Sequence, residues 1–396
     1  MARSTAVVAS ILLGIPVCRG VVAQTPAALT TELRDQLAGY VVENYNSPEM
    51  YVVEKLRDHD VVFLGEWHRI RHDLELIQRL IPLVYEAGVH VLATEFARRA
   101  DQPLLDSLVA APDWDEALAR EILFRMYVHW GYQEYVDVFR AAWELNRDLP
   151  DRAPIFRVVG VNNAPDWSVI ESPSDEQNPQ VRRQVWHGET EEDWARPILE
   201  QVERGEKVLA HMGFHHSFTR YRQPIVVDAE FVRFGDVRAG NWVYEALGDR
   251  AFTISLHSPW FSAQGYQAGF VRPADGLIDA LFESSPGLRS LRVGFDVVGS
   301  PFADLPGETA VYRHGYESFD LATLCDGYIY QGPLESYRGV TPIPDFVNAS
   351  NLERARLQSP MHRFRRARPV DFLAHARRLA DIPRRFAALL RRPAGR

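Results

Sequence analysis

Short apolar runs alternate with longer amphipathic stretches along most of the chain. Five runs of six or seven residues contain few polar side chains: 60–66 (DVVFLGE), 90–96 (HVLATEF), 155–161 (IFRVVGV), 207–212 and 251–256 (AFTISL). Such lengths are typical of strands buried on both faces. A sixth run, 327–330 (GYIY), follows a predicted helix over 317–325.

Helical periodicity fills the intervals between these runs. Over 70–87 apolar residues recur with the spacing of one helix face, and Gly88 follows as a helix-ending residue. Further helical patterns occupy 102–109, 113–124 and 133–145. The segment 166–194 is charged, contains prolines and lacks periodicity, so we expect an irregular surface excursion there.

Strands that alternate with helices and are apolar on both faces favour one fold class. We predict an α/β fold with a mostly parallel central sheet covered by helices on both faces. The 396 residues, of which 46% are hydrophobic and 24% charged, can form this sheet as a single main domain over 24–350.

The first residues have the layout of a secretory signal. Arg3 precedes an apolar run over 6–17, and small residues end at Ala23, where we predict cleavage of a signal peptide over 1–23. A buried N-terminal helix is the alternative. Ile15, Pro16 and Val17 lack the small residue required before a lipid-attachment cysteine, so we do not expect an anchor at Cys18. We therefore expect an exported, periplasmic protein.

Charge is distributed unevenly. The formal net charge is −9, yet the segment 351–396 carries thirteen Arg against three acids, about +10, which leaves about −19 for the remainder. An acidic main body argues against nucleic-acid binding. In the Arg-rich tail Phe372, Leu379 and Phe386 recur every seven residues, and Pro383 should kink any helix. This segment could contact an anionic membrane surface peripherally or dock on the protein with its arginines in solvent.

Side chains able to bind metal or transfer protons stand at the ends of successive predicted strands. Because ligands of parallel sheets bind beyond the carboxyl ends of the strands, we expect these side chains to form one site. They are Glu66, His68, Glu95, Asn162, Asn163, His211, His215, His216, His257 and Asp326. A single histidine is more often structural, but the combined set favours a site. Removal of Cys18 would leave Cys325 as the one cysteine, so any metal must be held by His and carboxylates.

Two motifs of the form G-x-x-H mark this set: GEWH (Gly65–His68) and GFHH (Gly213–His216). Together with His72, Gln78, Glu95 and the segment 130–146, they resemble the superfamily that joins the haem-uptake lipoprotein ChaN, the Tiki and TraB proteins and the erythromycin esterases. ChaN-like domains are the closest in pattern. The resemblance spans roughly 60–259 and implies a single α/β domain with a His/Glu pocket.

The resemblance implies different activities, because Tiki-like members are regarded as metal-dependent proteases, erythromycin esterases as metal-independent hydrolases and ChaN as a haem binder. We predict hydrolysis of an ester or amide bond in a small-molecule or peptide substrate. His68, Glu66, Glu95 and His216 are the predicted catalytic residues, and His68, Glu95, His216 and His211 are the predicted ligands of a divalent Zn, Mn, Co or Fe ion. In a metal-free version His68 acts as a base and Arg69 or Arg71 stabilises an oxyanion. A haem- or iron-binding uptake protein without catalysis is the alternative.

Overall fold

The computed structural model describes residues 29–390. The predicted signal peptide, its alternative as a buried helix, and Cys18 lie outside this range. Within it, no helix combines the length and the apolar character needed to cross a membrane.

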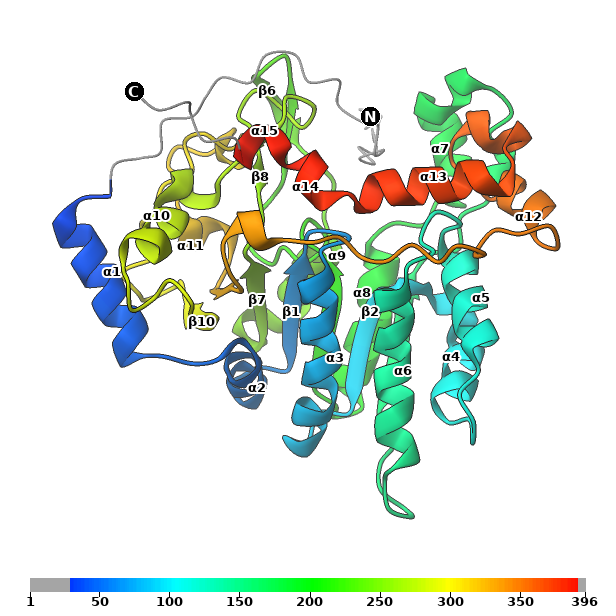
Figure 1. Cartoon of the computed structure of the whole chain (residues 1–396), viewed down its shortest axis with the longest axis horizontal. Helices are drawn as coiled ribbons and strands as arrows, with labels where there is room; N and C mark the ends of the chain where they lie inside the picture. The colour runs from blue at the N-terminus through cyan, green and yellow to red at the C-terminus, as the bar shows by residue number, and fades with distance from the viewer. Residues whose placement is uncertain (1–28, 391–396) are drawn as a thin grey trace, which may run out of the picture.

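The chain is built around a seven-stranded sheet (Figure 1). Its strands pair in parallel except for the edge strand β10, which runs antiparallel to β11. In spatial order the strands are β10 (Val293–Asp296), β11 (Gly327–Tyr330), β7 (Ala251–Leu256), β1 (Val61–Glu66), β4 (Val208–Gly213), β2 (Val91–Arg98) and β3 (Arg157–Asn162). All six predicted strands are therefore confirmed, and β10 is added to them.

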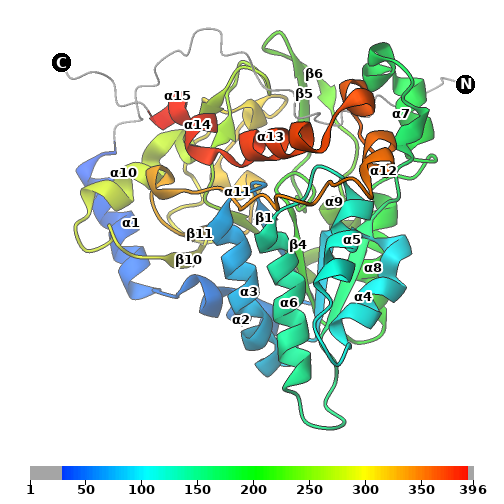
Figure 2. The ribbon, with the colours of Figure 1, turned by 45° about the vertical axis from the view of Figure 1, so that its right-hand side comes forward.

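Alternate side chains of the strands enter two different cores, as the pleat requires. Val62 and Leu64 of β1 pack with helices of one face, whereas Val61 and Phe63 pack with helices of the other. The first layer contains α2 (Pro48–Asp58), α3 (Arg71–Glu86), α4 (Gln102–Val109), α5 (Glu116–Met126) and α6 (Gln133–Arg147), and the second contains α8 (Glu192–Glu203) and α9 (Ala239–Leu247). Figure 2 shows α3 and α6 side by side in the first layer. The predicted α/β fold with helices on both faces is confirmed.

A third apolar cluster lies beside the β10 edge. It unites α1 (Thr31–Glu43), α10 (Leu277–Ser284), α11 (Leu321–Leu324) and the small hairpin of β8 (Trp260–Phe261) with β9 (Phe270–Val271). A second small hairpin, β5 (Pro224–Val227) with β6 (Glu230–Phe234), packs against the cluster through Val226. The helix expected over 317–325 is limited to α11, because Asp320 caps it by accepting a hydrogen bond from Thr323 N at 2.8 Å.

The segment 166–194 lies largely at the surface, as expected, but it contains 3-10 turns and a short helix and is therefore less irregular than predicted. Trp167, Ile170 and Val185 form a small core of their own beneath two 3-10 turns and α7 (Pro179–Val185). Residues after α7 then lead into α8. This local core explains how a charged, Pro-containing segment keeps a defined path.

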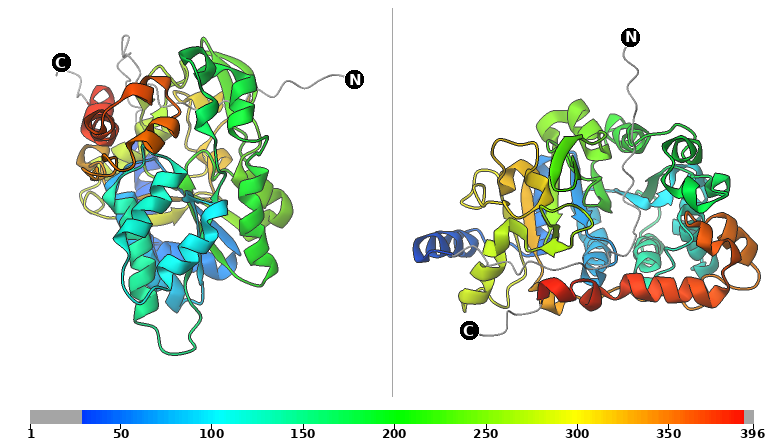
Figure 3. Two further views of the ribbon diagram at one scale, coloured as in Figure 1. Left: turned by 90° about the vertical axis from the view of Figure 1, so that its right-hand side faces the viewer. Right: turned by 90° about the horizontal axis from the view of Figure 1, so that it is seen from above.

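The Arg-rich tail packs on the body of the protein. It contains α12 (Leu352–Leu357), α13 (Pro369–Ala380), α14 (Ile382–Arg385) and α15 (Ala387–Leu390), and Figures 1 and 3 show α13 and α14 crossing above the ends of α3 and α6. Phe372, Leu379 and Phe386, the seven-residue repeat, are all buried. The helix breaks at Asp381, so Pro383 falls in the first turn of α14, where a missing N–H costs nothing. The tail thus docks through its apolar face.

Candidate functional site

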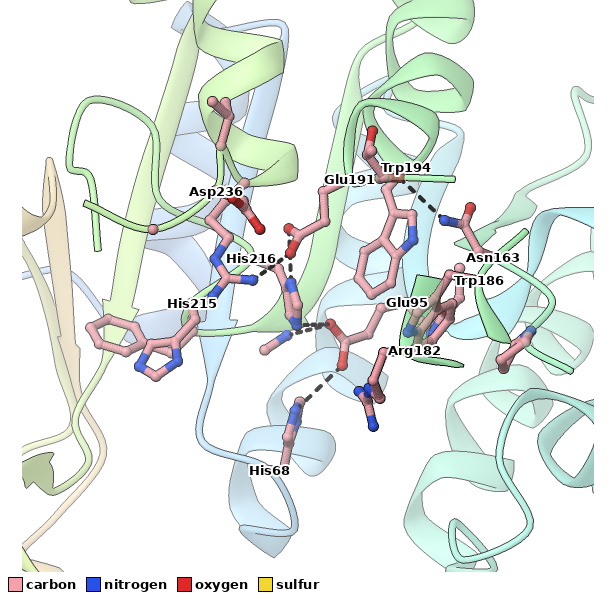
Figure 4. A pocket seen from close by; sticks show the side chains of 18 of the residues that line it. His68, Glu95, Asn163, Arg182, Trp186, Glu191, Trp194, His215, His216 and Asp236 are labelled. Carbon is pink, nitrogen blue, oxygen red and sulfur yellow. Dashed lines mark hydrogen bonds and ion pairs between the residues drawn. The ribbon is translucent and has the colours of Figure 1, made fainter. Parts of the chain in front are cut away.

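A cavity of about 910 Å³ opens at the carboxyl ends of β1, β4, β2 and β3. Its lining includes Glu66, His68, Glu95 and His216. These four predicted catalytic residues come together because the strands that carry them are neighbours: β1 pairs with β4, and β4 with β2. Figure 4 shows Glu95 between the two histidines.

Glu66 is a buried carboxylate that holds His68. Its Oε1 accepts a hydrogen bond from Tyr135 Oη at 2.6 Å and lies 2.8 Å from His68 Nδ1. Its Oε2 lies 2.8 Å from His211 Nε2. Burial opposes the charge, but His211 and His68 more than offset it and lower the pKa of Glu66 to about 2. The anion therefore fixes the His68 ring with Nε2 toward the cavity.

Glu95 presents its carboxylate between the two rings. Its Oε1 lies 3.5 Å from His68 Nε2, and its Oε2 lies 3.8 Å from His216 Nε2. The Gly213 N–H donates to Oε2 at 3.0 Å, and the Asn162 side chain donates to the Glu95 carbonyl oxygen at 3.0 Å. The side-chain carboxylate and the main-chain carbonyl of Glu95 are thus each held by a hydrogen bond from a neighbouring strand.

Glu191 holds His216 as Glu66 holds His68. Its Oε2 lies 2.9 Å from His216 Nδ1 and accepts a hydrogen bond of 3.0 Å from the N–H of Ala239 at the start of α9. Its Oε1 accepts a hydrogen bond of 2.5 Å from the Arg238 guanidinium. Burial opposes the Glu191 charge, but His216 and Arg238 lower its pKa to about 2. Burial likewise opposes a charge on His216, yet Glu191 and Glu95 raise the pKa of His216 above its usual range.

Glu191 was not predicted. It lies at the start of α8, within the acidic run Glu189–Asp193, and nothing in that run distinguishes it from its neighbours. Only the packing of α8 beside α9 brings it to His216. The arrangement is a pair of carboxylate–histidine dyads, Glu66–His68 and Glu191–His216, facing one carboxylate.

The secondary candidates divide into two groups. His215, Asn162 and Asn163 line the cavity, although His215 is occupied by a 2.8 Å contact with Tyr312 Oη and burial holds its pKa well below the usual range. His211 lies beneath Glu66, as a support. His72, His257, Asp326 and Arg69 do not line it.

Each excluded candidate has a local partner elsewhere. The His72 ring contacts Tyr337, His257 Nδ1 contacts Tyr328 Oη at 2.8 Å, and Asp326 pairs with Arg220. Asp326 precedes β11, so it lies at the amino end of that strand, not at the carboxyl edge. The fully buried Arg69 has φ of +75° and stacks on Trp130, with 3.9 Å from its guanidinium carbon to the ring centre.

The donor types at the site are those that metals accept. Imidazoles whose other nitrogen meets a carboxylate are typical metal ligands. Among residues 29–390, however, no group of three or more His, Cys, Asp or Glu side chains is arranged to hold a metal ion. The predicted ligand set, including His211, therefore stays a prediction.

Comparison with known proteins gives one family match. Residues 52–150 match the family model described as haem-binding uptake, Tiki superfamily, ChaN. This segment contains Glu66, His68 and Glu95, but not GFHH, so the match is shorter than the resemblance expected over 60–259. No curated protein matches the sequence.

Several solved structures are similar at low identity. A Bacillus cereus protein is 12% identical, with 78% of this chain and 98% of that chain covered and a TM-score of 0.46. ChaN of Campylobacter jejuni, whose structure is described as showing cofacial haem binding, is 11% identical over 54% of this chain and 87% of that one, with a TM-score of 0.35. A MARTX toxin effector domain from Vibrio vulnificus is 19% identical over 57% and 37% of the two chains, with a TM-score of 0.32. Residues 52–150 of the chain are therefore similar to the ChaN and Tiki superfamily, which is the resemblance that the strand-end motifs predicted.

Proposed function

We propose that the protein hydrolyses an ester or amide bond at His68, Glu95 and His216. The observation that carries the proposal is the pair of dyads: two imidazoles, each anchored through Nδ1 to a carboxylate, turn Nε2 toward a third carboxylate in a large cavity. A structural role would require neither two anchored rings nor a cavity at their free nitrogens.

The two histidines have complementary roles. In the tautomer with its proton on Nδ1, His68 accepts a proton at Nε2 from a water molecule that Glu95 orients. The water oxygen then bonds to the substrate carbonyl carbon. His216, whose raised pKa favours the charged form, donates its Nε2 proton to the leaving oxygen or nitrogen as the bond to the carbonyl carbon breaks. One water is consumed and the protons balance.

Each of these steps is carried out by a side chain of the protein. Whether an ion binds is a separate measurement. A single equivalent of Zn, Mn, Co or Fe in the purified protein, lost in His68→Gln and His216→Gln, would support the metal-dependent version.

Haem binding is the second candidate, favoured by the description of the matched family model. The cavity is lined by aromatic residues, among them Phe96 and Trp130, which stack with 5.6 Å between ring centres beside His68. His68 or His216 would offer Nε2 to the iron, and haem would supply a bound iron for uptake. Haemin titration, followed at the Soret band, tests this candidate directly.

The hydrolase is tested with esters of 4-nitrophenol and with a peptide mixture. We expect His68→Gln, Glu95→Gln and His216→Gln each to lower kcat/KM by roughly 100-fold or more, the usual contribution of a general acid or base. His187→Asn is the matched control, because His187 is exposed and its φ of +51° suits Asn. Full activity in all three site variants would exclude the proposed mechanism.

A further inference from the structure

The cavity is much larger than a water molecule and a carbonyl group require. Beyond Glu95 its wall is built by the folded segment 166–194, which contributes Trp167, Arg182 and Trp186. In the view of Figure 4, Arg182 and Trp186 lie on the opposite side of Glu95 from His216. This part of the cavity has no role in the proton transfers described above.

Arg182 is a buried cation without an anionic partner. Its residue surface is 5% exposed, and its Nη1 has no hydrogen-bond partner. Among the described residues it forms no ion pair, and its charged face lies over Trp167, 5.4 Å from the guanidinium carbon to the ring centre. Burial lowers the pKa of Arg182, as expected for a buried cation without an anionic partner.

Other arginines of the cavity wall differ in this respect. Arg238 donates to Glu191 and to Gln223, and Arg222 donates to the Gly235 carbonyl oxygen. Arg385 donates to the Leu379 carbonyl oxygen at 3.3 Å. Of these four arginines, Arg182 alone has no hydrogen-bond acceptor for its guanidinium among the described residues, although a buried guanidinium is costly unless its N–H groups are satisfied.

We propose that Arg182 binds an acidic group of the substrate, a carboxylate or a phosphate, while the scissile bond lies at His68 and His216. This inference rests on the proposed function of that site. A guanidinium presents paired N–H donors that match both anions. Trp167 and Trp186, whose ring centres lie 5.4 Å apart, contact the apolar part of the same molecule. The substrate class is therefore an amphipathic acid carrying an ester or amide bond.

Kinetics on a matched pair of esters test the inference. The probes are 4-nitrophenyl butyrate, which is neutral, and the 4-nitrophenyl monoester of glutaric acid, which ends in a carboxylate. We expect Arg182→Met to lower kcat/KM for the acidic ester by roughly tenfold or more, the loss expected for one charged hydrogen-bonding group, and to leave the neutral ester nearly unchanged. Arg182→Lys should restore part of the loss. Arg289→Gln, at an exposed arginine that does not line the cavity, should change neither rate.

Equilibrium binding separates this inference from the proposed hydrolysis. Benzoate and phenyl phosphate are titrated into wild type, Arg182→Met and His68→Gln, with tryptophan fluorescence as the readout. Binding that is lost in Arg182→Met and kept in His68→Gln supports the anion site even where no ester is hydrolysed, and the better of the two probes identifies the acidic group. Binding to Arg182→Met as tight as to wild type, or an equal loss for acidic and neutral esters in a variant that melts like wild type, would overturn it.

Discussion

Glu191 and His216 share a hydrogen bond of 2.9 Å across 25 residues of sequence. This bond joins the start of α8 to the loop after β4, and it is the counterpart of the Glu66–His68 bond that joins the end of β1 to its own loop. The equivalence of the two pairs makes Glu191 as important to His216 as Glu66 is to His68.

Replacement of Glu191 should therefore reduce activity. Glu191→Gln keeps the shape of the side chain but removes the charge that stabilises protonated His216. We expect kcat/KM for ester hydrolysis to fall by roughly 100-fold. Glu203→Gln, at an exposed glutamate at the end of α8 that does not line the cavity, is the control and should retain wild-type rates. Equal rates in both variants would show that His216 needs no anchor.

A methyl group at position 213 should displace His68. A Cβ there would lie 2.5 Å from His68 Cε1 and 2.8 Å from its Nε2, closer than such contacts allow. The obstacle is the far end of a side chain, so we expect Gly213→Ala to fold and to lose roughly 100-fold in kcat/KM through misplacement of the base. Gly39→Ala is the control, because nothing lies within 4 Å of its added Cβ. Thermal melting and kinetics on the two variants distinguish an effect on the site from one on the fold.

Phe386 should anchor the tail. It is fully buried and contacts the rings of Trp67 and Phe270, with 6.4 Å and 5.3 Å between ring centres. Phe386→Ala should lower the free energy of unfolding by roughly 3 to 5 kcal/mol, as measured in urea. Val370→Ala, at a site 55% exposed, should cost about 0.5 kcal/mol or less. A small effect at Phe386 would indicate that the tail rests only loosely on the body.

Acid should weaken docking of the tail. Burial, with Arg378 and Arg363 nearby, lowers the pKa of His375 to about 3. The His129 ring, 4.8 Å from it between centres, has a pKa held well below its usual range by burial, His375, Arg69 and Arg363. Exposed histidines titrate near 6.5, so the undocked state binds more protons as pH falls below about 6.5, and stability declines in that direction.

Hydrogen exchange over α13 from pH 7.5 to 4.5 follows this effect. Protection should be full at the upper end and decrease steadily below pH 6.5. His375→Gln, which has no titrating ring, should show a shallower decrease. Protection that is constant over the whole range would contradict a role for these histidines.

The fold could be predicted from sequence because its strands are apolar on both faces and short enough to be distinguished from helices. The same logic located Glu66, Glu95 and His216, since neighbouring parallel strands must end at one edge. It failed for His257, which follows β7 at that edge but turns into the cluster around Tyr328. It also missed Glu191 and Arg182, because both lie in a segment whose path is set by the packing of Trp167, Ile170 and Val185, which no periodicity reveals.

The docked tail gives the cavity a wall that is synthesised late. Pro360 and Arg385 line the same space as His68, although some three hundred residues separate them from it. Because translation proceeds from the amino terminus, a ribosome-bound chain can assemble its strands and its histidines before this side of the cavity exists. A chain interrupted between residues 351 and 384 would contain all four residues of the dyads, yet it would lack Arg385 and leave the cavity incompletely enclosed.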